Sequence, residues 1–106
     1  MQVDVTQELK LRSGEPLERA TKVENGKVIE KETLTFKIVA IEALECMTDL
    51  DKNITGTIKR QRGKLADKIY DEEKEYSIDE TKMLKDRIDQ VSTTYVLNVM
   101  YNILGE

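Results

Sequence analysis

Histidine and tryptophan are absent from this 106-residue chain, which also has one cysteine, one proline and one phenylalanine. Without histidine, no site can use imidazole as a general base or as a zinc ligand. Cys46 has no partner for a disulfide within the chain, and no basic segment followed by an apolar stretch marks a signal peptide. We therefore expect a cytoplasmic protein that is not an enzyme and has no catalytic residue, cofactor or metal.

Long apolar runs are also missing. The longest is interrupted by Lys37, Glu42 and Glu45, whereas a bilayer span needs roughly 20 mostly apolar residues. We therefore expect no membrane partner. The chain is 39% hydrophobic and 36% charged, with a net charge of -4, which favours a folded domain with a densely ionic surface over a disordered chain.

The N-terminal third carries β signals. Apolar residues of one parity, Val3, Val5, Leu9 and Leu11, alternate with polar ones and predict a strand with one solvated face. The segment 13–16 then predicts a turn. Asn25-Gly26 lies between two β-prone segments and predicts a hairpin with Val23 opposite Val28 and Glu24 opposite Lys27.

From Thr35 onward the apolar period becomes helical. Thr35 is the expected N-cap of a first helix, apolar around most of its circumference, that forms the buried centre and ends within 49–53. Its apolar positions are Phe36, Ile38, Val39, Ala40, Ile41, Ala43, Leu44 and Met47. Cys46 falls inside this helix, so we expect it to be a buried packing residue.

Three more helices are expected. The second covers about 57–73, with Ile58, Leu65 and Ile69 on its inner side. The third begins with a capping box of Ser77 and Glu80 and turns Leu84, Ile88 and Val91 inward. The fourth opens at Thr93 or Thr94, carries an apolar stripe of Val96, Leu97, Met100, Ile103 and Leu104, and ends at Gly105.

Together these signals predict an α+β fold in one domain. Residues 1–34 form the antiparallel β unit and residues 35–106 form a body of about four helices. The length suits a single core, and no repeat or Gly-, Ser- or Pro-rich linker divides the chain.

Two segments resemble ligand-binding loops but depart from them. Residues 49–53 begin like a calcium loop, yet Ile54 and Arg60 stand where the loop needs glycine and a bidentate carboxylate. Gly56 and Gly63-Lys64 suggest a phosphate loop, but Leu65 replaces the metal-binding hydroxyl and no strand precedes it. We interpret both as helix and loop segments.

Two surfaces are candidates for binding. The last helix offers a protein interface, because apolar and tyrosine side chains cluster on it: Tyr95, Val99, Met100, Tyr101, Ile103 and Leu104. The segment 59–68 offers a nucleic-acid or anion contact through Lys59, Arg60, Arg62, Lys64 and Lys68. The acidic run 71–73 follows it directly, so salt bridges or an oligomer contact are the alternative reading.

Three segments of the helical body carry a resemblance. The patterns Lys64-Leu65-Ala66-x-Lys68-Ile69-Tyr70, Tyr76-Ser77-Ile78-Asp79-Glu80 and Leu84-Lys85-Asp86-Arg87-Ile88 resemble small phage- and prophage-encoded proteins. The likeness covers about residues 35–104 and consists of helix faces and caps. It transfers no functional residue, and it implies a protein that binds a partner.

The leading hypothesis is a non-catalytic phage-type interaction or assembly protein that self-associates through helical surfaces. Its partner would be a second copy, a phage protein or a host protein. One alternative is a nucleic-acid-binding regulator that uses the basic face 59–68. Another is an inhibitor of a host defence or nuclease complex.

Overall fold

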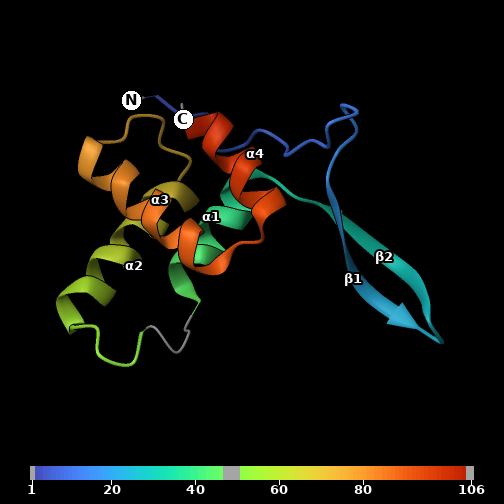
Figure 1. Ribbon diagram of the computed structural model, residues 1–106, viewed down its shortest axis with the longest axis horizontal. Helices are drawn as coiled ribbons and strands as arrows, with labels where there is room; N and C mark the ends of the chain where they lie inside the picture. The colour runs from blue at the N-terminus through green and yellow to red at the C-terminus, as the bar shows by residue number, and fades with distance from the viewer. Residues whose placement is uncertain (1, 47–50, 105–106) are drawn as a thin grey trace.

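The computed structural model describes residues 2–46 and 51–104. Within these ranges a two-stranded antiparallel sheet precedes four helices, so the chain has the α+β fold predicted from the sequence. The helices pack together into a body, and the hairpin projects from one side of it (Figure 1). The elements are β1 (Glu18–Glu24), β2 (Lys27–Thr33), α1 (Phe36–Glu45), α2 (Gly56–Tyr70), α3 (Ile78–Val91) and α4 (Thr94–Leu104).

Strands β1 and β2 are joined by Asn25-Gly26, whose φ angles are 52° and 76°. Positive φ at both central residues matches the right-handed twist of the flanking strands. The pairs Val23–Val28 and Glu24–Lys27 are those expected from the sequence. All of β1 and the first five residues of β2 are exposed. We refer to residues 18–33, which stand away from the body, as the arm.

The base of the arm is tied to α1 by Arg19. Its Nη1 and Nη2 donate to the two carboxylate oxygens of Glu42, each at 2.8 Å, and its Nε donates to Glu32 at 2.9 Å. The hydrogen bonds from Arg19 lower the pKa of Glu42. These groups are solvated, so the ion pairs contribute little to stability. Their main effect is on the direction in which the arm leaves the body.

Hydroxyl side chains begin three of the helices. Thr35 Oγ1 accepts a hydrogen bond from Ile38 N at 3.2 Å, and Thr55 plays the same part in α2. Ser77 Oγ accepts from Glu80 N at 3.1 Å while Glu80 Oε1 accepts from Ser77 N at 2.9 Å. The predicted cap at Thr35 and the predicted capping box are therefore confirmed.

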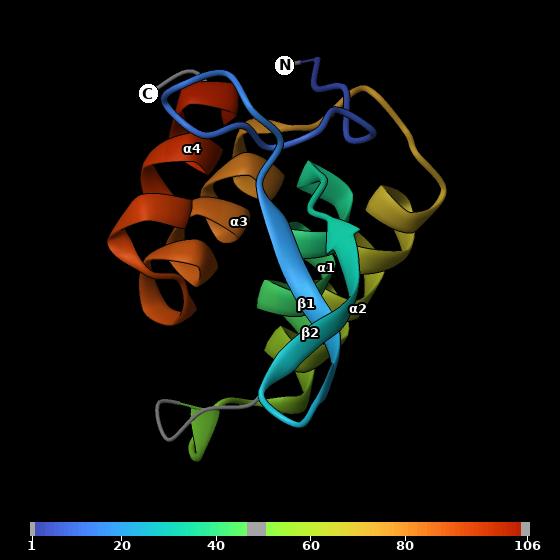
Figure 2. The same ribbon diagram turned by 90° about the vertical axis from the view of Figure 1, so that its right-hand side faces the viewer.

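All four helices contribute to one hydrophobic core. Phe36 and Ala40 of α1, Ile69 of α2, Ile88 of α3 and Met100 of α4 are each at most 1% exposed. Helix α1 contacts both α2 and α3, as expected for a helix with apolar side chains on most sides. Figure 2 shows the arm lying in front of α1 and the N-terminal segment crossing above the helices.

The strand predicted over residues 3–11 is wrong. Gln2, Glu8 and Lys10 instead form isolated bridges to three separate residues of the chain, Glu75, Thr35 and Pro16. Asp4 interrupts it, because its carboxylate accepts a hydrogen bond from Thr6 N at 3.0 Å and turns the backbone. The alternation nevertheless identifies the inward side chains, since Val3, Val5 and Leu9 are all buried.

Helix α1 ends earlier than predicted. Glu45 is its last residue, and Cys46 follows in an extended conformation with φ -64° and ψ 139°. This change of backbone direction takes Cys46 out of the inward stripe and leaves it exposed, so the expectation of a buried cysteine is wrong. Met47 and residues 49–50 of the predicted helix end and calcium-like loop lie outside the described residues.

The other helix predictions differ mainly at their ends. Helix α2 stops at Tyr70, three residues early, and Glu72 just beyond it has φ 60°. Ile58 in its first turn is 38% exposed, so its predicted inward position is wrong. Thr93 Oγ1 accepts from Val96 N at 3.5 Å at the start of α4, while the predicted stop at Gly105 lies outside the described residues. None of the helices in the described ranges is long and apolar enough to span a bilayer.

Candidate interaction groove

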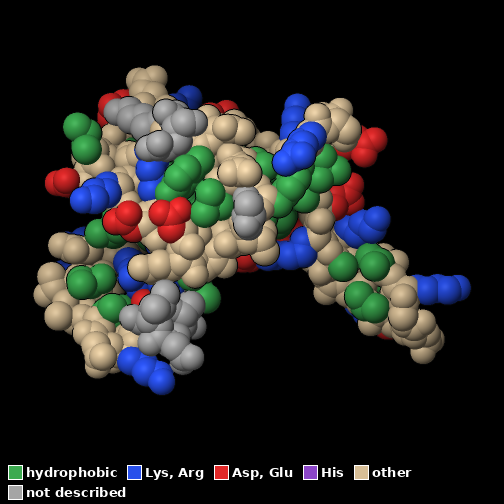
Figure 3. Space-filling model, in the orientation of Figure 1, with side chains coloured by type: hydrophobic (Ala, Val, Ile, Leu, Met, Phe, Trp, Pro, Cys, Tyr) green, Lys and Arg blue, Asp and Glu red, His purple; other side chains and the backbone are tan. Residues whose placement is uncertain are grey.

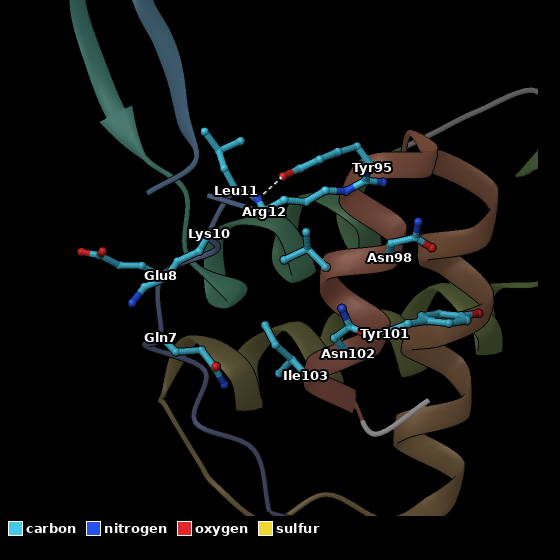
Figure 4. A pocket seen from close by; sticks show the side chains of 11 residues that line it. Gln7, Glu8, Lys10, Leu11, Arg12, Tyr95, Asn98, Tyr101, Asn102 and Ile103 are labelled. Atoms are coloured by element: carbon cyan, nitrogen blue, oxygen red, sulfur yellow. Dashed lines mark hydrogen bonds between the residues drawn. The ribbon is translucent and has the colours of Figure 1, made fainter. Parts of the chain in front are cut away.

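A groove of about 1030 Å³ separates helix α4 from the N-terminal segment. One wall is the extended chain before the arm, and the other is the outer face of α4 (Figure 4). The first wall consists of Gln7, Glu8, Lys10, Leu11 and Arg12; the second consists of Tyr95, Asn98, Val99, Tyr101, Asn102 and Ile103. We call this feature the α4 groove.

The helical period explains the α4 wall. Tyr95, Val99 and Ile103 are four residues apart and therefore lie in one row along the helix. Asn98 and Asn102 form the adjacent, exposed row. The half-buried apolar row beside a row of amides presents both hydrophobic surface and hydrogen-bonding groups to whatever enters the groove.

Tyrosine hydroxyls anchor two positions on this wall. Tyr95 Oη accepts a hydrogen bond from Arg12 N at 3.1 Å and so bridges the two walls of the groove. Tyr101 donates to Asp89 Oδ1 of α3 at 2.6 Å, and Lys85 Nζ lies 5.9 Å from the centre of its ring. Both rings are held in place before any partner binds, which lowers the ordering cost of binding.

The structure divides the six interface residues selected from the sequence into two groups. Tyr95, Val99, Tyr101 and Ile103 line the α4 groove. Met100 and Leu104 are 0% and 3% exposed and belong to the core, so they are not available as contacts. The stripe of the last helix is therefore partly core and partly groove.

The five basic residues of 59–68 also fall into two groups. Lys59, Arg60 and Lys64 are exposed. Arg62 donates to Asp51 Oδ1 at 2.8 Å, whereas Lys68 donates to Glu80 at 2.9 Å and lies 4.8 Å from the centre of the Tyr76 ring. The salt-bridge alternative therefore holds for Arg62 and Lys68. Gly63 is internal to α2, so the phosphate-loop reading is excluded by the helix.

The Lys68–Glu80 pair borders two shifted ionisable groups. Burial raises the pKa of the Tyr76 hydroxyl to about 12, and the nearby charges of Glu73 and Glu80 act in the same direction. Burial also acts to raise the pKa of Glu80, but hydrogen bonds from Lys68 and Ser77 outweigh it and leave this pKa lowered. Both shifts are typical of a packed structural cluster.

The structure also contains a buried ionic cluster that the sequence patterns did not predict. Arg87 and Asp51 are 1% and 2% exposed, and Arg87 Nη2 donates to Asp51 Oδ2 at 2.7 Å. Arg87 Nε also donates to Ala43 O at 2.7 Å, and Nη2 donates to Cys46 O. Together with Arg62 this cluster joins the end of α1, the chain before α2 and helix α3. Asp51 is thus committed to arginine, which argues against the calcium-like reading of 49–53.

The exposure of the arm was also not foreseen. The sequence predicted its turn, but not that the hairpin stands away from the core. Val23, Val28 and Ile29 are 56%, 47% and 50% exposed, and Figure 3 shows hydrophobic side chains on the projecting arm as well as on the body. Exposed apolar side chains gathered on one element are typical of an interaction surface.

Among the described residues no group of three or more histidine, cysteine, aspartate or glutamate side chains is arranged to hold a metal ion. In the described part of the chain, the α4 groove and the arm both expose apolar side chains. Comparison of the chain with protein-family models, with curated proteins and with solved structures found no match to any of them.

Proposed function

We propose that this protein is a non-catalytic, phage-type interaction and assembly protein that self-associates, and that the α4 groove is its contact surface. The observation that carries the proposal is the row of Tyr95, Val99 and Ile103, which stays partly exposed while Met100 and Leu104 of the same helix are buried. A fold of this size that keeps such a row beside an open groove has a surface suited to a partner.

The lining chemistry suits a protein partner better than a small molecule. Tyrosines combine a large apolar area with a hydroxyl, and they are enriched at protein interfaces. The amides of Asn98 and Asn102 supply donors and acceptors beside them. The groove runs between the N-terminal segment and residues 95–103 of α4, so it can accept a polypeptide segment. We place this activity in the cytoplasm, that of the host cell if the protein is phage-encoded.

Sedimentation velocity from about 1 to 200 µM tests self-association. We expect a concentration-dependent oligomer, since interfaces of modest size commonly give micromolar dissociation constants. Val99→Arg places a charge in the groove and should raise the dissociation constant at least tenfold. Ile78→Lys is the matched control, because Ile78 is 88% exposed on α3 and does not line the groove. A wild-type monomer throughout this range would refute the proposal.

The second candidate function is nucleic-acid binding. It is favoured by the exposed cations Lys59, Arg60 and Lys64, which lie within two turns of α2 and can pair with backbone phosphates. It ranks second because Arg62 and Lys68 are already paired with carboxylates. Binding of a labelled duplex and a labelled single strand at 50 and 200 mM salt tests it. Affinity that falls with salt and is lost on replacing the three exposed cations by glutamine would support it.

A further inference from the structure

The N-terminal wall of the α4 groove has an open backbone edge. Leu9 N donates to Leu34 O at 2.9 Å, and Leu9 O accepts from Leu17 N at 2.8 Å. In extended chain the neighbouring residues point their backbone groups the opposite way. No hydrogen bond within residues 2–46 and 51–104 uses the backbone N–H or C=O of Glu8 or Lys10.

This edge faces the groove. Arg12 is two residues beyond Lys10 and has the same parity, and its N–H donates to the Tyr95 hydroxyl on α4. Figure 4 shows this bond crossing from one wall to the other. The groups of Glu8 and Lys10 are therefore turned toward the same space, where an extended segment can pair with them as an added strand.

The arm has the complementary features. It is a sheet of only two strands, so each strand has an unpaired outer edge, and an isolated hairpin of this kind is marginally stable in water. It also exposes Val23, Val28 and Ile29. A third strand and an apolar cover would stabilise it, and the α4 groove offers both.

We propose that the arm of a second copy of this chain lies in the α4 groove and pairs with the backbone edge of Glu8 and Lys10. Each copy receives the arm of the other, giving a two-fold dimer. This inference rests on the proposed self-association and adds which segments meet. Val23 and Val28, which are paired across the arm and therefore share one face of it, then contact the apolar groove residues Val99 and Ile103.

Length and charge agree with this occupant. A seven-residue strand spans about 24 Å and the edge over residues 8–10 spans about 10 Å, at roughly 3.4 Å per residue, so one strand covers the whole edge. Residues 18–33 contain four acidic and four basic side chains, so two arms do not repel each other through net charge. The arm carries charges of both signs, as does the edge with Glu8, Lys10 and Arg12.

The number of contacting residues favours reciprocal exchange. The groove is lined by eleven residues. With about eight residues from the arm, each copy brings close to the 20–30 residues a side of a standard interface. A single arm in a single groove would engage only about half of that set. The groove wall leads into the arm through a turn over residues 11–14, where Gly14 N donates to Leu11 O, so each copy carries both surfaces next to each other in the chain.

Cross-linking between two different single-cysteine variants tests the contact between copies. Both carry Cys46→Ser; one carries Lys10→Cys in the groove wall and the other carries Val28→Cys in the arm. A short thiol-specific cross-linker should join them efficiently when they are mixed. The control mixture pairs Lys10→Cys with Lys64→Cys, which is exposed on α2, and should yield at least tenfold less product.

Sedimentation velocity separates this proposal from the proposed function. If self-association holds, the double variant Val23→Asp with Val28→Asp should raise the dimer dissociation constant at least tenfold, and circular dichroism should show the helical body unchanged. A wild-type monomer would remove both ideas. A stable dimer whose dissociation constant is unchanged by the arm substitutions would overturn the arm assignment but not self-association. The same conclusion would follow if Lys10→Cys cross-linked to itself in preference to Val28→Cys.

Discussion

The buried ionic cluster gives the most quantitative test of how the helical body is held together. Arg87→Met keeps much of the side-chain volume but removes the donors to Asp51, Ala43 O and Cys46 O. Removing one partner of a buried ion pair costs about 3–5 kcal/mol. Arg62 still pairs with Asp51, which reduces the loss, whereas the buried carbonyl of Ala43, deprived of its donor, adds about 1–3 kcal/mol. We expect the free energy of unfolding to fall by about 4 kcal/mol.

Urea unfolding followed by far-ultraviolet circular dichroism measures this loss. With a slope of about 1.5 kcal/mol per molar urea, the midpoint should fall by about 2–3 M. Arg62→Met is the matched control, because Arg62 is 13% exposed and only one of its hydrogen bonds reaches Asp51; it should cost about 1–2 kcal/mol.

A double variant completes the cycle. Asp51→Leu combined with Arg87→Met removes both buried charges and should be more stable than Arg87→Met alone, because no unpaired carboxylate is left in the interior. A loss below about 1 kcal/mol for Arg87→Met, or a double variant no better than the single one, would show that the cluster does not stabilise the body as we infer.

Two further predictions concern packing and pH. Ile88→Ala, at a side chain that is 0% exposed, should cost about 2–5 kcal/mol through lost contacts and a cavity, whereas Ile78→Ala on the same helix should change stability by less than about 0.5 kcal/mol. The pKa of Glu80 is lowered from 4.5 in the fold, so its stabilisation is complete above that value and is lost as pH falls through the lower, folded pKa. Glu80→Gln should therefore make the urea midpoint less sensitive to pH between 5 and 3; an unchanged acid profile would contradict this.

Sequence reasoning succeeded where the signal is local. The hydroxyl of Thr35 and the Ser77–Glu80 pair act within one helical turn, so residue identity and spacing are enough to predict them. Asn25-Gly26 works over two residues, and the neighbouring strand pairs follow from it. The helical period likewise identified the core positions Leu84 and Ile88.

It failed where partners are distant. The residues before the arm alternate like a strand, but Val3 pairs with Lys74 O and Leu9 with Leu34 O, and no local pattern specifies such separate partners. The α4 groove likewise depends on two distant parts of the chain, the N-terminal segment and α4. Periodicity placed Met100 and Ile103 on one apolar stripe, and only the packing of α4 in the fold shows that Met100 is buried whereas Ile103 lines the groove.

Arg87 shows that part of the missing information was present in the pattern. Leu84, Ile88 and Val91 were predicted to face inward, and position 87 lies three residues after the first of them, on the same side of the helix. A charged residue there must find a buried partner, since an isolated charge in the interior is unfavourable by several kcal/mol. The interrupted face thus indicated an ion pair in advance. Its partner, Asp51, lies 36 residues away in the sequence, too far for any spacing rule to predict the pair. The cluster and its contact with the end of α1 are therefore seen only in the structure.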